Sequence, residues 1–155
     1  IAVGSSFGTA NSSEPNADTY AKFGININNT SGYVVRDISG STNGANTFTG
    51  ANTFTWIANN SGASTTYLAP DGSTESIADD TWDLWVGTSK QLNDRAATTP
   101  TQTITDFKFG STGTSTFNAQ FDNFAIAAIP EPTTIILIGF GLFGLTLRRR
   151  RLGRR

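Results

Sequence analysis

The chain has 155 residues, contains neither Cys nor His, and carries a formal net charge of −1. The missing residues exclude disulfides, thiolate or imidazole metal sites, and Ser-His-Asp or Cys-His catalytic arrangements. Residues 1–129 hold five basic and eleven acidic residues, a net charge of −6, so nucleic acid is not an expected partner.

The chain contains no Met and begins at Ile1. We therefore expect a fragment or a processed form, with any signal peptide encoded upstream. The length fits one domain with an appendage. We predict an ectodomain over residues 1–129 and a distinct C-terminal segment over 130–155.

Short segments of alternating apolar and polar residues recur along the body and predict an all-β fold. The first candidate strand carries Phe23, Ile25 and Ile27. The sequence GANTFT then occurs twice, over 44–49 and 50–55. Two copies are too few for a solenoid, so we favour a duplication that lengthens a loop or an edge strand.

Turn residues and further strands follow in the second half of the body. The turn sequence APDG over 69–72 predicts that YLAPDGSTESI forms a hairpin. In WDLWV, over 82–86, the first, third and fifth residues share one face, and Asp83 and Trp85 share the other. Phe107 and Phe109 alternate around Lys108, and QFDNFAIAA over 120–128 predicts a last strand. We therefore predict an antiparallel β-sandwich, or a barrel, rather than a βαβ fold.

Four features carry a resemblance to a known family: the NNSG turn, the YLAPDG hairpin, the WDLWVG strand and the FDNFAI segment. Residues 50–128 resemble the C-terminal half of the concanavalin A-like (LamG-like) jelly-roll domains of bacterial surface proteins. Family domains are longer than this body. The resemblance therefore implies a jelly roll that is incomplete at its N-terminus.

Aromatic side chains are the candidate carbohydrate contacts, because sugar rings stack on exposed aromatic faces. Trp56, Tyr67 and Trp85 are the candidates, and packing between sheets is the favoured alternative for each single ring. The fold analogy makes polysaccharide a candidate partner. A purely structural surface spacer is the alternative.

The acidic residues single out neither a metal site nor a catalytic pair. Asp79, Asp80 and Asp83 are weak Ca²⁺ candidates, and a solvated loop is the favoured interpretation. No spacing marks two carboxylates as a glycosidase pair, so we expect no enzyme and no cofactor. The alternative is a glycan-cleaving enzyme whose catalytic strands lie upstream of this sequence.

The C-terminal segment has the features of a short membrane anchor. Residues 133–147 carry no charge and, as a helix, would reach about 22 Å against a hydrocarbon core of about 30 Å. The large apolar residues of this run are Ile135, Ile136, Leu137, Ile138, Phe140, Leu142, Phe143 and Leu145. Membrane lipid is therefore an expected partner. The arginines that follow, Arg148, Arg149, Arg150 and Arg151, are expected to stay cytoplasmic and to place the body in the periplasm.

Pro130, Glu131 and Pro132 precede the apolar run, and the prolines would stop the helix from extending into the body. The triplet, the apolar run and the Arg-rich tail over 148–155 resemble a PEP-CTERM sorting signal. This resemblance implies recognition by exosortase, an integral-membrane transpeptidase-like enzyme that cuts near the motif. It also implies delivery from an inner-membrane intermediate to the cell surface or an exopolysaccharide matrix.

Overall fold

The computed structural model describes residues 1–28, 32–111 and 120–127 of the chain. The chain divides into two compact units, Ile1–Phe117 and Asn118–Arg155. All the strands among the described residues belong to the first unit. The described part of the second unit, residues 120–127, has no regular secondary structure.

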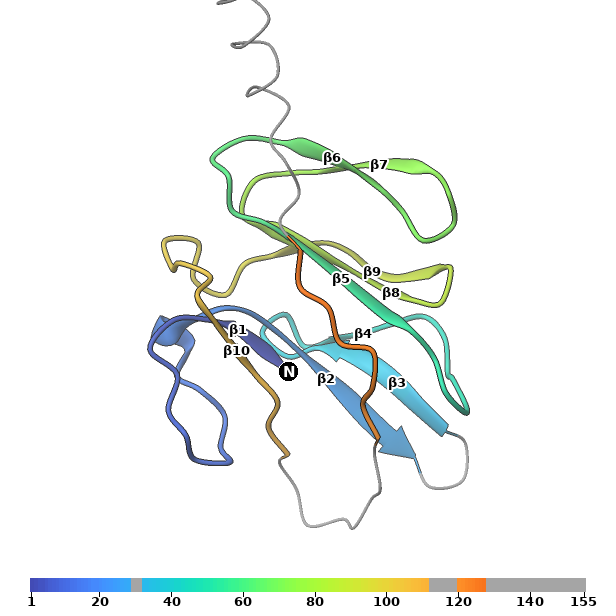
Figure 1. Ribbon diagram of the computed structural model, residues 1–155, viewed down its shortest axis with the longest axis horizontal. Coiled ribbons are helices and arrows are strands. Elements are labelled where there is room, and N and C mark those ends of the chain that lie inside the picture. The colour runs from blue at the N-terminus through green and yellow to red at the C-terminus, as the bar shows by residue number, and fades with distance from the viewer. Residues whose placement is uncertain (29–31, 112–119, 128–155) are drawn as a thin grey trace, which may run out of the picture. The chain divides into compact units, whose positions relative to one another are not determined.

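The first unit is built from antiparallel β-strands (Figure 1), which confirms the predicted all-β class. The strands are β1 (Ala2–Gly4), β2 (Thr19–Asn28), β3 (Gly32–Asp37), β4 (Thr42–Asn43), β5 (Phe54–Asn59), β6 (Thr65–Leu68), β7 (Thr74–Ile77), β8 (Thr81–Val86), β9 (Ser89–Ala96) and β10 (Asp106–Lys108). A short 3-10 helix, Asn16–Asp18, precedes β2. The predicted hairpin corresponds to β6 and β7, and the WDLWV segment to β8.

The strands form three sheets. The order is β10-β1-β2-β3-β4 in the five-stranded sheet and β5-β8-β9 in the three-stranded sheet, while β6 and β7 pair alone. In Figure 1 the three-stranded sheet lies between the five-stranded sheet and the β6–β7 hairpin. This layering is compatible with the predicted sandwich, and the jelly-roll strand order stays a prediction.

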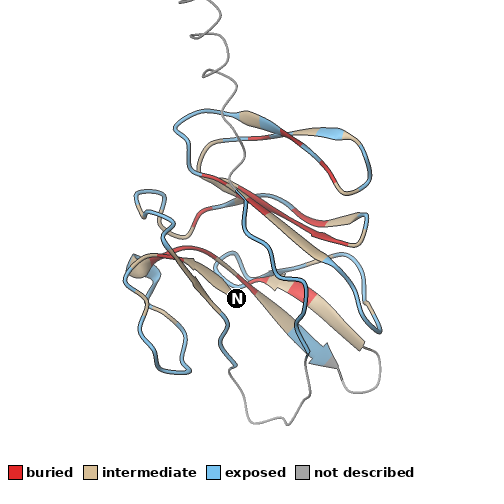
Figure 2. Cartoon of the chain, in the orientation of Figure 1, coloured by how far each residue is buried: buried red, intermediate tan, exposed pale blue. Residues whose placement is uncertain are grey.

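A hydrophobic core lies between the five-stranded and three-stranded sheets, where the buried segments of both sheets lie in Figure 2. Its buried members are Tyr20, Ala21, Phe23, Val35, Trp82, Leu84, Val86, Leu92 and Ala97. Each large side chain buried here contributes about 1.5–3 kcal/mol. The two sheets therefore hold together mainly through the removal of these side chains from water.

Six aromatic rings form a continuous series of contacts beside this core. In order of contact they are Phe48, Tyr33, Phe54, Phe23, Trp56 and Trp82. Trp56 lies edge-on to both of its neighbours, with centroid distances of 5.0 Å to Phe23 and 5.9 Å to Trp82. Edge-to-face pairs of this kind add about 0.5–1.5 kcal/mol each beyond their buried area.

The two copies of GANTFT differ in structure. The first lies in the connection between β4 and β5, where Phe48 forms an isolated bridge with Tyr33. The second leads into β5, where Phe54 pairs with Val86. Both Phe rings lie 5.9 Å from the Tyr33 ring. The duplication therefore lengthens a loop, as predicted, and also supplies a second ring to the aromatic series.

Strand β8 is buried on both faces, and its side chains alternate as predicted. Trp82, Leu84 and Val86 belong to the core between the sheets. Trp85 belongs to a second cluster beneath the hairpin, with Ile57, Tyr67, Ala69 and Ile77. Asp83, on the Trp85 side of the strand, is fully buried. An acidic residue with no exposure requires polar partners, which the hairpin side provides.

The strand predicted over 120–128 is wrong for the residues that the structure describes. Residues 120–127 contain no strand, and Phe121, Phe124 and Ile126 are exposed. Asn123 has a φ of +51°, in the left-handed region that Asn tolerates better than most residues. This conformation interrupts an extended backbone in the middle of the alternating pattern.

A buried lysine–carboxylate network as the candidate functional site

The β6–β7 hairpin positions one side of the site. Its turn follows the chemistry predicted for APDG: Gly72 has a φ of +88°, and its amide donates to the Ala69 carbonyl at 2.9 Å. Asp71 Oδ1 accepts the amide of Ser73 at 2.9 Å, which is an Asx turn. The register that follows places Tyr67 directly opposite Glu75.

Asp83 is the fully buried acid beneath this hairpin. Its Oδ2 accepts a 2.6 Å hydrogen bond from the Tyr67 hydroxyl, and its Oδ1 accepts a 2.7 Å bond from the backbone amide of Asp94. The β8–β9 ladder shifts register between Trp82 and Leu84, and Asp94 has a φ of +46°. This bulge releases the Asp94 amide from the ladder, so the carboxylate can take it.

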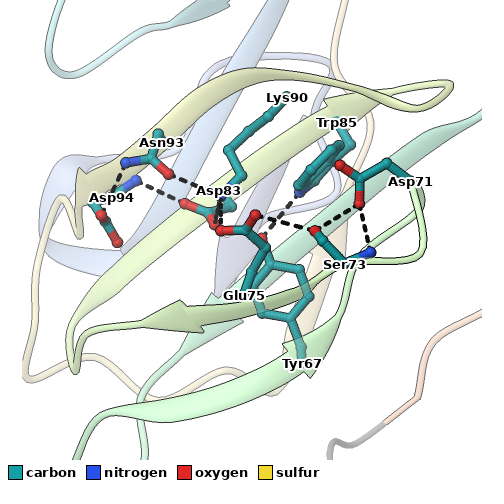
Figure 3. A network of polar contacts seen from close by, with 9 residues as sticks. All are labelled: Tyr67, Asp71, Ser73, Glu75, Asp83, Trp85, Lys90, Asn93 and Asp94. Carbon is teal, nitrogen blue, oxygen red and sulfur yellow. Dashed lines mark hydrogen bonds and ion pairs between the residues drawn. The ribbon is translucent and has the colours of Figure 1, made fainter.

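Lys90, in β9, is the cation of the site (Figure 3). Its Nζ lies 3.0 Å from Glu75 Oε2, 3.2 Å from Asp83 Oδ2 and 2.9 Å from Asn93 Oδ1. An ammonium group has three hydrogens, and these three oxygens match them in number. We call Tyr67, Glu75, Asp83 and Lys90 the buried network, after its buried members Tyr67 and Asp83. The side chains of Lys90 and Glu75 are 18% and 33% exposed.

The rings of Trp85 and Tyr67 and the hydroxyl of Ser73 also lie next to these charged groups. The Lys90 Nζ lies 5.1 Å from the Trp85 ring centroid and 6.0 Å from that of Tyr67, within cation–π range. Trp85 Nε1 donates to the Tyr67 oxygen at 3.0 Å. Ser73 Oγ lies 3.2 Å from Glu75 Oε1 and 2.7 Å from Asp71 Oδ1.

The electrostatics follow from this geometry. Burial and the hydrogen bond to Asp83 raise the pKa of Tyr67 to about 12, so its hydroxyl stays a donor at neutral pH. Burial disfavours the charged form of Lys90, but the hydrogen bond to Glu75 and the charge of Asp83 outweigh it and raise the pKa of Lys90. The network thus holds one cation between two acids, with Asp83 shielded from water.

The arrangement has two chemical consequences. The contacts of Asp83 and Lys90 join the hairpin to the three-stranded sheet through side chains from β6, β7, β8 and β9. They also hold a primary amine beside a carboxyl group from which water is excluded. The contacts between the hairpin and the sheet are structural, whereas the amine beside the carboxyl group is a geometry in which the two groups could react.

The three rings that were predicted to contact sugar differ in how deeply they are buried. Tyr67 is 6% and Trp85 2% exposed, and both belong to the cluster beneath the hairpin. Neither ring is exposed in this structure, which weighs against stacking on carbohydrate, and a sugar contact by either ring stays a prediction. Trp56 is half-buried between Phe23 and Trp82.

The three acids proposed as weak Ca²⁺ ligands have separate roles. Asp83 is engaged with Tyr67, Asp94 and Lys90, whereas Asp79 Oδ1 accepts the amide of Gly62 at 2.8 Å. Asp80 has a φ of +55° in the turn before β8. In the part of the chain that the structure describes, no group of three acids is placed to hold a metal ion.

Sequence reasoning missed Lys90 and Glu75 and assigned Asp83 and Tyr67 to other roles. One signal could have located the site: Asp83 sits inside WDLWV, a strand that is apolar on both faces. A buried carboxylate in such a strand needs a cation or several donors. Nothing in the local sequence, however, indicates which of the chain's cations supplies it.

Comparison with known proteins identifies the C-terminal segment. Residues 128–151 match the family model of the PEP-CTERM protein-sorting motif. No curated protein and no solved structure matches the chain. The chain thus carries a PEP-CTERM motif, as predicted, and signals of this kind are recognised by exosortase and mark exported proteins processed at the membrane.

The individual parts of this signal lie outside the described residues. They are the Pro130–Pro132 triplet, the predicted membrane helix over 133–147 and the arginines from residue 148 onward. In the described ranges, no helix has the length and hydropathy that a membrane crossing requires. The membrane helix therefore stays a prediction from the sequence.

Proposed function

We propose that this chain is a cell-surface or extracellular-matrix protein whose β-sandwich is a structural module delivered by its C-terminal signal. The observation that carries the proposal is the match of residues 128–151 to the PEP-CTERM sorting motif. In this proposal the triplet at 130–132 is a substrate for exosortase. The body faces the periplasm until it is processed.

The proposal that the body is structural rather than catalytic is based on the ion pairing of its acidic side chains. Glu75 and Asp83 are both paired with Lys90. A glycosidase instead needs two carboxylates that face a substrate cleft, with distinct proton affinities. We therefore propose that the body does not turn over an external substrate.

The sorting proposal is tested by replacing Pro130, Glu131 and Pro132 together with alanine in a host that carries an exosortase. We expect the variant to accumulate in the inner-membrane fraction with its tail intact, while the parent is shortened and released. Immunoblots of both chain ends in each fraction measure this. The matched control replaces Thr133 and Thr134 with alanine and should be processed like the parent. Equal processing of all three chains would refute the proposal.

The structural role is tested separately on a glycan array. We expect the chain to bind no glycan, because the Tyr67 and Trp85 rings are buried. Trp56 is the predicted contact that keeps partial exposure. Specific binding that is abolished by Trp56→Ala, with the fold intact by circular dichroism, would favour a carbohydrate-binding module instead.

A further inference from the structure

The buried network places a nucleophile against an electrophile. Lys90 Nζ lies 3.2 Å from Asp83 Oδ2, and Asp83 is fully buried. The 3.2 Å contact joins Nζ to Oδ2 and so places the amine beside Cγ, the atom that it would attack. Groups held close together in a fixed geometry gain a large effective concentration. The two residues lie on the adjacent strands β8 and β9, so no chain movement is needed to bring them together.

The neighbours of this pair are the groups that an amide-forming reaction requires. Glu75 Oε2, 3.0 Å from Nζ, is placed to take a proton from the ammonium as a general base. The same contact raises the pKa of Lys90, so the neutral amine is a minor species and bond formation is slow. The Asp94 amide, 2.7 Å from Oδ1, can stabilise negative charge on that oxygen as an oxyanion donor. The Tyr67 hydroxyl, 2.6 Å from Oδ2, can donate to that oxygen as it leaves.

We propose that Lys90 and Asp83 condense spontaneously to an intramolecular isopeptide bond, with Glu75 as the base. Glu75 takes one proton from the ammonium and passes it to Asp83 Oδ2, and the neutral amine then attacks Cγ of the carboxylic acid and forms the Nζ–Cγ bond. The Cγ–Oδ2 bond then breaks, and Oδ2 leaves as water.

The step balances without a further reactant. Lys90 Nζ begins with three hydrogens and keeps one. The other two end on Oδ2, one by way of Glu75 and one directly. The positive and negative charges of the pair disappear together, and no oxidant or reductant takes part. Exclusion of bulk water from Asp83 opposes hydrolysis in the reverse direction.

The bond would replace the ion pair between the adjacent strands β8 and β9 with a covalent link. The loop that it closes, from residue 83 to residue 90, is short, so its effect on chain entropy is small. Its main effect would be to make the side-chain link between β8 and β9 indifferent to salt and acid, which act on ion pairs. Such a link suits a protein exposed outside the cell.

The test is the mass of the full chain, purified in detergent and shown to be folded by its tryptophan emission. We expect the mass to be lower than the sequence mass by one water. Trypsin should also fail to cut after Lys90, so that residues 37–95 appear as one peptide lacking one water instead of as 37–90 and 91–95. A folded chain with the full mass that is cut normally after Lys90 would overturn the proposal.

Fragmentation spectra separate this bond from a succinimide at Asp71-Gly72, which also loses one water. An isopeptide leaves the 83–90 loop unfragmented and the Asp71-Gly72 bond unmodified, whereas a succinimide leaves Lys90 free for trypsin. The second result would count against the proposal.

Three variants test the assigned roles. Lys90→Arg keeps the charge but removes the primary amine, so this variant should not react and should retain the full mass. Asp83→Asn should still react, with loss of ammonia instead of water. Glu75→Gln leaves both reacting groups in place and should slow bond formation by about 100-fold or more, followed by mass after refolding. A Glu75→Gln chain that reacts at the parental rate would remove Glu75 from the mechanism.

Discussion

The Tyr67 hydroxyl donates a 2.6 Å hydrogen bond to the buried Oδ2 of Asp83 and joins the β6–β7 hairpin to the three-stranded sheet. It also accepts a bond from Trp85 Nε1. We predict that Tyr67→Phe lowers the free energy of unfolding by about 1–3 kcal/mol, because a buried donor and a buried acceptor lose their partner. Chemical denaturation in the Lys90→Arg background, which retains Asp83 Oδ2, measures the change. Thr66→Val, on the exposed face of the same strand, should change it by less than about 0.5 kcal/mol.

The titration of Tyr67 predicts an alkaline loss of stability. Its pKa is raised from 10.0 to about 12, first by burial and then by Asp83, so the folded state holds this proton more tightly than the unfolded state. The resulting stability is complete below pH 10 and is lost as the pH rises from 10 towards 12. Denaturation midpoints measured across this range in the Lys90→Arg background, which keeps the Asp83 carboxylate, should fall more steeply with Tyr67 than with Tyr67→Phe. Identical slopes would contradict the assignment.

A second buried ion pair joins the two main sheets. Asp37 in β3 is 2% exposed, and its Oδ2 lies 2.8 Å from Nε of Arg95 in β9. We predict that Arg95→Ala destabilises the fold by about 3 kcal/mol, because it leaves a buried carboxylate uncompensated. Arg95→Lys keeps the charge without the fork geometry and should cost less. Equal losses in urea denaturation for the two variants would show that the guanidinium geometry, rather than the charge, stabilises the pair.

Two tryptophans in the aromatic series differ in their polar contacts. Trp82 Nε1 donates to the Ala96 carbonyl at 3.2 Å, whereas Trp56 Nε1 is buried without a hydrogen-bond partner in the described part of the chain. Trp56→Phe should therefore cost less stability than Trp82→Phe, by about 1 kcal/mol. Thermal or chemical unfolding of both variants gives the comparison. The reverse order would indicate that a partner of Trp56 lies outside the described residues.

The terminal arginines should set the orientation of the chain in the membrane. We predict that replacing Arg148–Arg151 with alanine lowers severalfold the fraction of chains whose body reaches the periplasm, because the positive charge that holds this end in the cytoplasm is reduced. Replacement with lysine keeps the charge and should leave the fraction unchanged. Protease accessibility of the body in spheroplasts measures both. A loss with lysine as well would point to recognition of arginine itself.

The elements that could be predicted from the sequence are those that depend on residues close together along the chain. The APDG turn needs only Pro70, Asp71 and Gly72, so the hairpin could be predicted directly. The period of two in WDLWV correctly divided its side chains between two faces. The same alternating pattern over 120–128 predicted a strand that the structure does not contain in residues 120–127. Asn123 has a positive φ there, and the sequence pattern gives no sign of it.

The sequence by itself determined the all-β class, the hairpin, the two faces of β8 and the sorting signal, because each depends on residues that lie close together along the chain. Only the tertiary structure decided that Asp83 meets Lys90 and Glu75, and that Tyr67 and Trp85 are buried rather than exposed. These outcomes depend on the hairpin packing over the three-stranded sheet and on a bulge that releases the Asp94 amide. The physical reason is that burial and charge pairing are set by contacts between strands, which periodicity within one strand does not specify.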